Sequence, residues 1–154
     1  MTPLAAPPGR AAPVKAPWKL ILVGYDGSAS GARAVAFAMD LAALMHAEVF
    51  VLHAAEQPVD VIEPVTEEEM GARRVVDEEA LRALARDAER GGIKVRWEIR
   101  EGNPVQVLLD AATESSADLI VVGTRGLRGT PKVLLGSVSS GVVAGAKVPV
   151  TVLH

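Results

Sequence analysis

The sequence contains no cysteine, few aromatic residues and no long hydrophobic run. Without cysteine, the chain has no disulfide framework, thiolate nucleophile, zinc ribbon or cysteine-bound iron–sulfur cluster. Its apolar runs are far shorter than the ~20 residues that span a bilayer, which argues against an integral membrane protein. The net charge of −3 among 154 residues argues against a nucleic-acid binder with a broad basic face. We therefore expect one cytoplasmic domain whose chemistry rests on oxygen, nitrogen and backbone groups.

The first 17 residues differ in composition from the rest of the chain, because they are mostly alanine and proline. Proline lacks a backbone donor and alanine buries little surface, so this stretch cannot build a core. It also lacks the apolar segment of a secretory signal. The sequence predicts a disordered extension over residues 1–17 and a folded domain over residues 18–154.

From Trp18 onward, segments typical of strands alternate with segments typical of helices. Short apolar runs at 20–23, 49–52 and 119–122 are typical of strands covered on both faces. Residues 93–100 alternate between apolar and charged side chains, and residues 148–153 form a last strand with Pro149 near its start, so both are predicted to be edges. This pattern predicts an α/β fold, a single doubly wound five-stranded parallel sheet in the order 3-2-1-4-5 with helices on both faces.

The helices are predicted from apolar stripes with the i, i+3, i+4, i+7 spacing. Ser28 and Ser30 are candidate N-caps of the first helix, and Pro104 suits the first turn of the third. Gly141 and Gly145 fall in a short last helix, where each costs up to ~1 kcal/mol relative to alanine and is expected to leave the helix mobile. The expected buried stripes are Ala34, Phe37, Ala38 and Leu41; Leu81, Leu84, Ala85 and Ala88; and Val105, Leu108, Leu109 and Ala112.

A glycine-rich loop, residues 123–137, follows the most apolar strand and opens a helix. Glycines let backbone N–H groups approach a ligand, and a helix N-terminus attracts phosphate. The loop carries the cations Arg125, Arg128 and Lys132, so it is a candidate phosphate cradle; the alternative is a surface connection whose glycines are only turns. The P-loop and dinucleotide-binding glycine patterns are absent, and the three histidines lack the spacing of a zinc site.

The spacing Gly123-x2-Gly126-x9-Gly136-Ser137 resembles the nucleotide-binding signature of the universal stress protein family. The resemblance extends over residues 18–154, with further similarity at residues 20–28, 51–54, 136–139 and 148–150. It implies an ATP site, and since the glycine motif is complete it implies the ATP-binding subclass.

The resemblance also assigns roles within that site. Gly24 and Asp26 match the turn that approaches the ribose and phosphates, and the backbone of Ala54 matches the position that recognises adenine. Asp26 has two possible roles: reaching a Mg²⁺ ion that bridges phosphate oxygens, or capping the following turn or helix. The remaining positions, which match those around ribose and phosphates, are Val122, Gly123, Arg125, Gly126, Gly136, Ser137, Val138 and Ser139.

Together these features predict a nucleotide-responsive stress regulator that is at most a slow ATPase, because the sequence supplies no convincing general base. Val148, Val150 and Val152 form an apolar row on the last strand, and the resemblance implies a homodimer through that strand. Two alternatives remain open. One is an ATP-using enzyme of a related α/β fold, and the other is a dimeric interaction module that binds no nucleotide.

Overall fold

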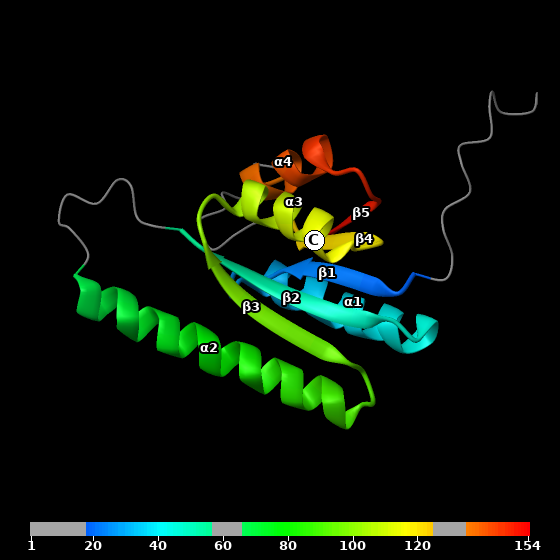
Figure 1. Cartoon of the computed structure of the whole chain (residues 1–154), viewed down its shortest axis with the longest axis horizontal. Helices are drawn as coiled ribbons and strands as arrows, with labels where there is room; N and C mark the ends of the chain where they lie inside the picture. The colour runs from blue at the N-terminus through cyan, green and yellow to red at the C-terminus, as the bar shows by residue number, and fades with distance from the viewer. Residues whose placement is uncertain (1–17, 57–65, 125–134) are drawn as a thin grey trace, which may run out of the picture.

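The computed structural model describes residues 18–56, 66–124 and 135–154, and these residues form five parallel strands in one sheet (Figure 1). The strand order is β3-β2-β1-β4-β5, so the predicted order is confirmed. The predicted extension, residues 1–17, lies outside the described residues. The strands are β1 (Leu20–Gly24), β2 (Glu48–Ala55), β3 (Val95–Glu101), β4 (Leu119–Gly123) and β5 (Val150–Leu153).

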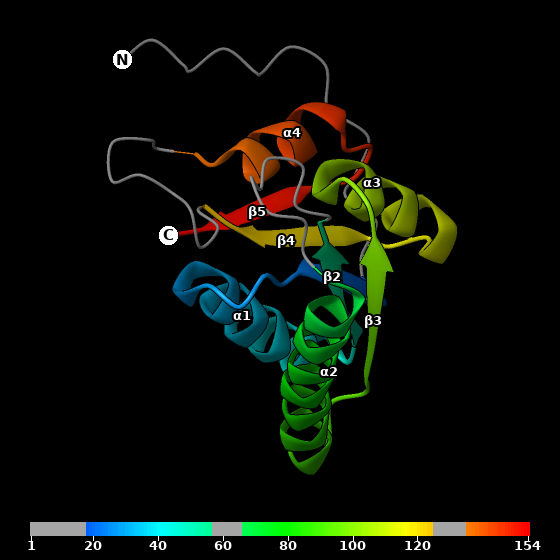
Figure 2. The same ribbon diagram turned by 90° about the vertical axis from the view of Figure 1, so that its left-hand side faces the viewer.

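Two helices cover each face of the sheet (Figure 2). Helices α1 (Ala29–Met45) and α2 (Glu67–Arg90) pack on one face, while α3 (Pro104–Ser115) and α4 (Ser137–Gly145) pack on the other. Consecutive residues of β1 enter opposite cores: Ile21 faces α1, and Leu22 faces α3, both fully buried. A strand that buries both faces needs a continuous apolar run, which is why β2, β1 and β4 occupy the interior of the sheet.

Polar side chains close the starts of three helices. Ser28, one of the two predicted candidates, caps α1 by accepting from the Gly31 N–H. A capping box between Thr66 and Glu69 begins α2. Asn103 caps α3, with Pro104 in its first turn as predicted.

The buried stripe of α1 differs from the predicted one at Phe37, which is 36% exposed. Ala34 and Ala38 are buried as predicted, and Leu41 is partly buried against the same core. Val35 and Ala42, which the prediction left out, are buried as well. Small side chains at intervals of four residues let the helix lie close to the sheet, and the large ring of Phe37 is left at the rim. The stripe predicted for α2 is confirmed at Leu81, whose side chain is buried.

The two glycines of α4 have a packing role. A Cβ atom on Gly141 would lie 2.7 Å from Val105 Cγ2, and one on Gly145 would lie 2.6 Å from Leu109 Cδ1. Both partners are on α3, so the glycines let α3 and α4 approach closely. Their low helix propensity is therefore offset by contact between the two helices.

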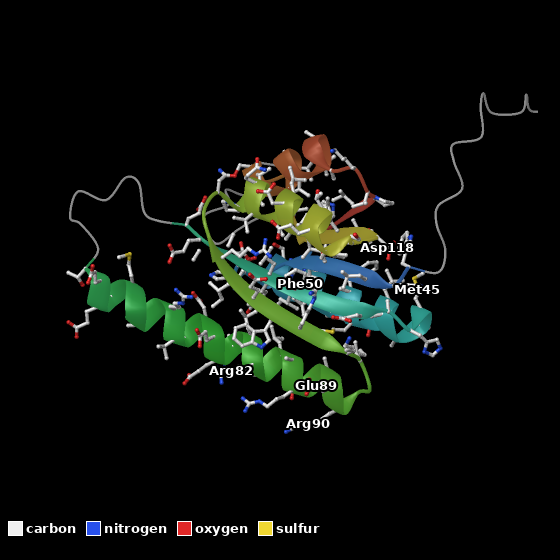
Figure 3. The ribbon with its side chains drawn as sticks, viewed as in Figure 1. Met45, Phe50, Arg82, Glu89, Arg90 and Asp118 are labelled. Atoms are coloured by element: carbon white, nitrogen blue, oxygen red, sulfur yellow. The ribbon has the colours of Figure 1, made fainter. Side chains whose placement is uncertain are left out.

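The edge strand β3 carries charge on the face that α2 leaves uncovered. Arg96 lies over the ring of Phe50, 4.2 Å from its centroid, and pairs with Glu48. On the other face, Arg82 of α2 lies 5.7 Å from the ring centroid of Trp97 (Figure 3). No helix within the described part of the chain is long and apolar enough to cross a bilayer.

Candidate functional site

The carboxyl ends of β1, β2 and β4 meet at one edge of the sheet. The chain leaves β1 toward β2 on one side, and β4 lies on the other, so the winding direction reverses between β1 and β4. In open α/β sheets, ligands bind beyond the carboxyl ends of the strands at this position. Gly24 and Gly123 end the two central strands there, and Ala54 lies near the end of β2.

The turn after β1 is organised by the Asp26 carboxylate. Its Oδ1 atom accepts hydrogen bonds from the Ser28 N–H at 2.9 Å and the Ser28 hydroxyl at 2.5 Å. Ser28 Oγ in turn accepts from the Gly31 N–H at 3.0 Å. A Cβ atom on Gly31 would lie only 2.8 Å from Asp26 Oδ1. Asp26 therefore has the capping role that was one of its two predicted roles, while its side chain stays exposed.

Gly123 lies directly against the first turn of α1. A Cβ atom on Gly123 would lie 2.5 Å from Ser30 Oγ and 2.7 Å from the Ser30 carbonyl carbon. The absence of a side chain at this position therefore lets β4 and α1 approach each other. This packing requirement holds whether or not a ligand is bound.

The start of α4 is fastened to the end of β4 on the far side of the glycine-rich loop. The Gly136 N–H donates to the Thr124 carbonyl. The Ser139 hydroxyl contacts two carbonyl oxygens, of Gly136 at 3.0 Å and of Thr124 at 3.3 Å. Thr124 and Ser139 are both buried. These bonds place the N-terminus of α4 beside the winding reversal, where a helix start attracts anions.

Most of the predicted site residues lie at this edge, and they differ in exposure and in whether their side chains are already hydrogen-bonded. Ser137 is exposed, Val138 is half-buried, and the Ser139 hydroxyl is occupied within the protein. The Val122 side chain is 3% exposed and belongs to the core under α3, so it presents backbone to the edge. Arg125 and Gly126 lie outside the described residues.

Sequence reasoning did not connect His53 to this site, although it lies beside Ala54. His53 Nδ1 is 2.8 Å from the Tyr25 carbonyl oxygen, and His53 Nε2 is 3.2 Å from Asp77 Oδ2 of α2. The His53 side chain is 15% exposed. Asp77 gave no signal, because it is one of many charged residues on α2.

Metal-binding and acidic groups at this edge can be surveyed among the described residues. Among residues 18–56, 66–124 and 135–154, no three His, Asp or Glu side chains are grouped so that they could hold a metal ion. Asp26 is the acidic side chain at the end of β1, and one of its oxygens is held by Ser28. A metal at this site would therefore need ligands from elsewhere, such as phosphate oxygens.

Comparison with known proteins decides the family. Residues 17–154 match the model of the universal stress protein family. The chain belongs to the universal stress protein family. A universal stress protein from Thermus aquaticus is 40% identical over 138 residues, which cover 89% of this chain and 99% of that relative.

Solved structures of universal stress proteins have the same architecture. UspA from Lactobacillus plantarum is 26% identical, with a TM-score of 0.83 over 91% of this chain and all of that one. A universal stress protein solved in complex with cAMP is 30% identical, with a TM-score of 0.67 over 89% of this chain and 97% of that one. The predicted family and the predicted fold are thus confirmed.

Proposed function

We propose that this universal stress protein binds an adenine nucleotide, ATP together with Mg²⁺, at the carboxyl edge of the sheet. The observation that carries the proposal is the attachment of α4 to β4 through Thr124, Gly136 and Ser139. It brings a helix N-terminus to the end of β4, next to the point where the winding reverses between β1 and β4. The similar universal stress protein solved in complex with cAMP supports an adenine nucleotide as the ligand class.

In this proposal the adenine lies against the backbone of Ala54, and the ribose lies between Gly24 and Gly123. The phosphates reach the N-terminus of α4 at Ser137 and Val138, where the first backbone N–H groups of a helix lack intrahelical acceptors. Arg125 and Gly126 complete the phosphate contacts in the family resemblance. Mg²⁺ would be held by phosphate oxygens and the exposed Asp26 carboxylate, and it would neutralise phosphate charge.

Binding, rather than rapid hydrolysis, is the proposed activity. Hydrolysis needs a group that orients or deprotonates a water molecule. Asp26 is engaged with Ser28 at the start of α1, which suits a structural or metal-binding role better than that of a base. We therefore infer a cytoplasmic, nucleotide-responsive stress regulator that turns over ATP slowly if at all.

A homodimer through β5 is part of the same proposal. β5 pairs with β4 on one side and is the last strand of the sheet, so its other side is an edge. Val148, Val150 and Val152 are half-buried against the core under α3 and α4. The partner would therefore pair with the strand backbone, rather than with a freely projecting valine row.

The test is calorimetric titration of nucleotide-free protein with ATP and Mg²⁺, using Gly136→Val as the probe. Gly136 has φ −69° and ψ 166°, a conformation that valine adopts without strain. The variant should fold and bind ATP at least ten-fold more weakly, because a side chain enters the start of α4. Gly71→Val is the matched control, since a Cβ atom there meets nothing within 4 Å. Equal affinity in all three proteins would overturn the site.

A further inference from the structure

His53 joins three elements at the proposed site. It lies on β2, its Nδ1 atom contacts the Tyr25 carbonyl oxygen after β1 at 2.8 Å, and its Nε2 atom contacts Asp77 of α2 at 3.2 Å. The Tyr25 N–H also donates to the Leu52 carbonyl at 3.0 Å. Both backbone groups of Tyr25 are therefore held by β2, and Tyr25 lies between Gly24 and Asp26 of the site.

Both oxygens that face the His53 ring can only accept hydrogen bonds. A peptide carbonyl and an ionised carboxylate each require a donor, and a neutral imidazole has one N–H group. Only the doubly protonated imidazolium donates from both nitrogens. The observed arrangement is thus satisfied in full when His53 carries a proton on each nitrogen.

Several described charged groups on the surrounding elements have partners other than His53. On α2, Arg74 lies 3.9 Å from Glu78 and 3.7 Å from Glu101 of β3. On β3, Arg100 pairs with Glu98 and Glu114, and hydrogen bonds to these two carboxylates raise its pKa. On the turn after β1, the Asp26 carboxylate is directed to Ser28. Among the residues that the structure describes, Asp77 is the charged group in contact with the His53 ring.

We propose that His53 is a positioning residue through which proton binding regulates the nucleotide site. Protonated His53 ties the turn of Tyr25 and Asp26 to α2; deprotonated His53 loses one of the two contacts and leaves the turn less fixed. This inference rests on the proposed nucleotide binding.

The sign of the pH dependence of nucleotide affinity follows from thermodynamic linkage between proton and nucleotide binding. If the nucleotide-competent turn is the one held by protonated His53, nucleotide and proton each favour the binding of the other. Nucleotide affinity should then be higher when His53 is protonated and should fall as a rising pH removes that proton. Removal of either partner should flatten this dependence.

The experiment measures ATP–Mg²⁺ affinity from about pH 6 to pH 8 in the unaltered protein, in His53→Gln and in Asp77→Asn. The controls are His46→Asn, at the exposed left-handed C-cap of α1, and Asp87→Asn, on the exposed surface of α2. The titration of ATP itself is common to all five proteins. We expect an affinity loss of about five-fold over this range in the unaltered protein and both controls, and a clearly smaller loss in the other two variants.

Equal pH dependence in His53→Gln and in the unaltered protein would overturn the inference while leaving nucleotide binding intact. If none of the proteins binds ATP at any pH, the proposed function fails instead. The positioning role of His53, which holds the turn of Tyr25 when protonated, is then tested separately on the free protein, with ¹⁵N-labelled histidine. In mildly acidic solution, the histidine signals should show a doubly protonated His53, and the Tyr25 amide should be protected from exchange. Loss of both the second proton and the protection as the pH rises would support this role. Tyr25 exchange that is indifferent to His53 protonation would overturn it.

Discussion

The contact between Gly123 and α1 allows a stability prediction that does not depend on any ligand. In Gly123→Ala, the new methyl group would lie 2.5 Å from Ser30 Oγ, 2.7 Å from the Ser30 carbonyl carbon and 2.9 Å from the Gly31 nitrogen. Two of these atoms belong to the backbone at the capped start of α1, so they cannot move aside as a flexible side chain would. The substitution should therefore shift β4 and α1 apart.

The magnitude follows from two opposing effects. Overpacking of this kind costs about 1–3 kcal/mol, and replacing glycine by alanine recovers about 0.4–1 kcal/mol through the unfolded state. The two ranges leave a net loss in the free energy of unfolding between about 0 and 2.6 kcal/mol. Because two of the three close contacts are with backbone atoms, we expect about 1–2 kcal/mol. Gly24→Ala is a matched control at the end of the neighbouring strand, because its methyl group would meet side-chain atoms of Leu108 and Val122 at 3.1–3.3 Å.

Equilibrium unfolding in urea measures both variants. We expect a lower midpoint for Gly123→Ala with an unchanged slope, and a change within about 0.5 kcal/mol for Gly24→Ala, since side chains can move by tenths of an ångström. The reasoning would be refuted if Gly123→Ala were as stable as the unaltered protein, or if the two variants lost the same free energy.

Two further stability predictions use the same assay. Gly141→Ala should destabilise the protein, because its methyl group would lie 2.7 Å from Val105 Cγ2. In a Val105→Ala background the same substitution should instead stabilise the protein by up to ~1 kcal/mol through helix propensity. Equal effects in both backgrounds would contradict the packing role of Gly141. Asp118→Ala should lower the free energy of unfolding by about 1–2 kcal/mol, because Asp118 Oδ2 accepts from the N–H groups of Lys19 at 2.8 Å and Leu20 at 3.1 Å (Figure 3). Unchanged amide exchange at Leu20 in that variant would show that the Asp118 hydrogen bonds do not stabilise the start of β1.

Much of the fold could be predicted because its determinants are local. Continuous apolar runs marked β1 and β4 as central strands, and the alternation of β3 marked it as an edge. The face that a helix buries is less local. Phe37 shares the spacing of the buried alanines of α1, yet its exposure depends on how closely the helix approaches the sheet.

The candidate site likewise has features that could be predicted from the sequence and features that only the structure reveals. Glycine spacing and the acidic turn after β1 placed Gly24, Asp26 and Gly136 at one edge of the sheet. The contact of Gly123 with Ser30 and the bridge from His53 to Asp77 join residues that are far apart along the chain. No spacing rule connects such pairs, so the packing role of Gly123 and the attachment of α2 to the site emerged only from the structure.

The most direct test of the central claim is an ATP–Mg²⁺ titration of the ¹⁵N-labelled, nucleotide-free protein followed by amide chemical shifts. We predict saturating shifts concentrated at Gly24, Asp26, Ala54, Gly123 and Ser137. Amides at the amino ends of the strands, such as that of Leu119 at the start of β4, should change little. Shifts confined to the amino ends of the strands, or no saturable change at all, would contradict a nucleotide site at the carboxyl ends of the strands.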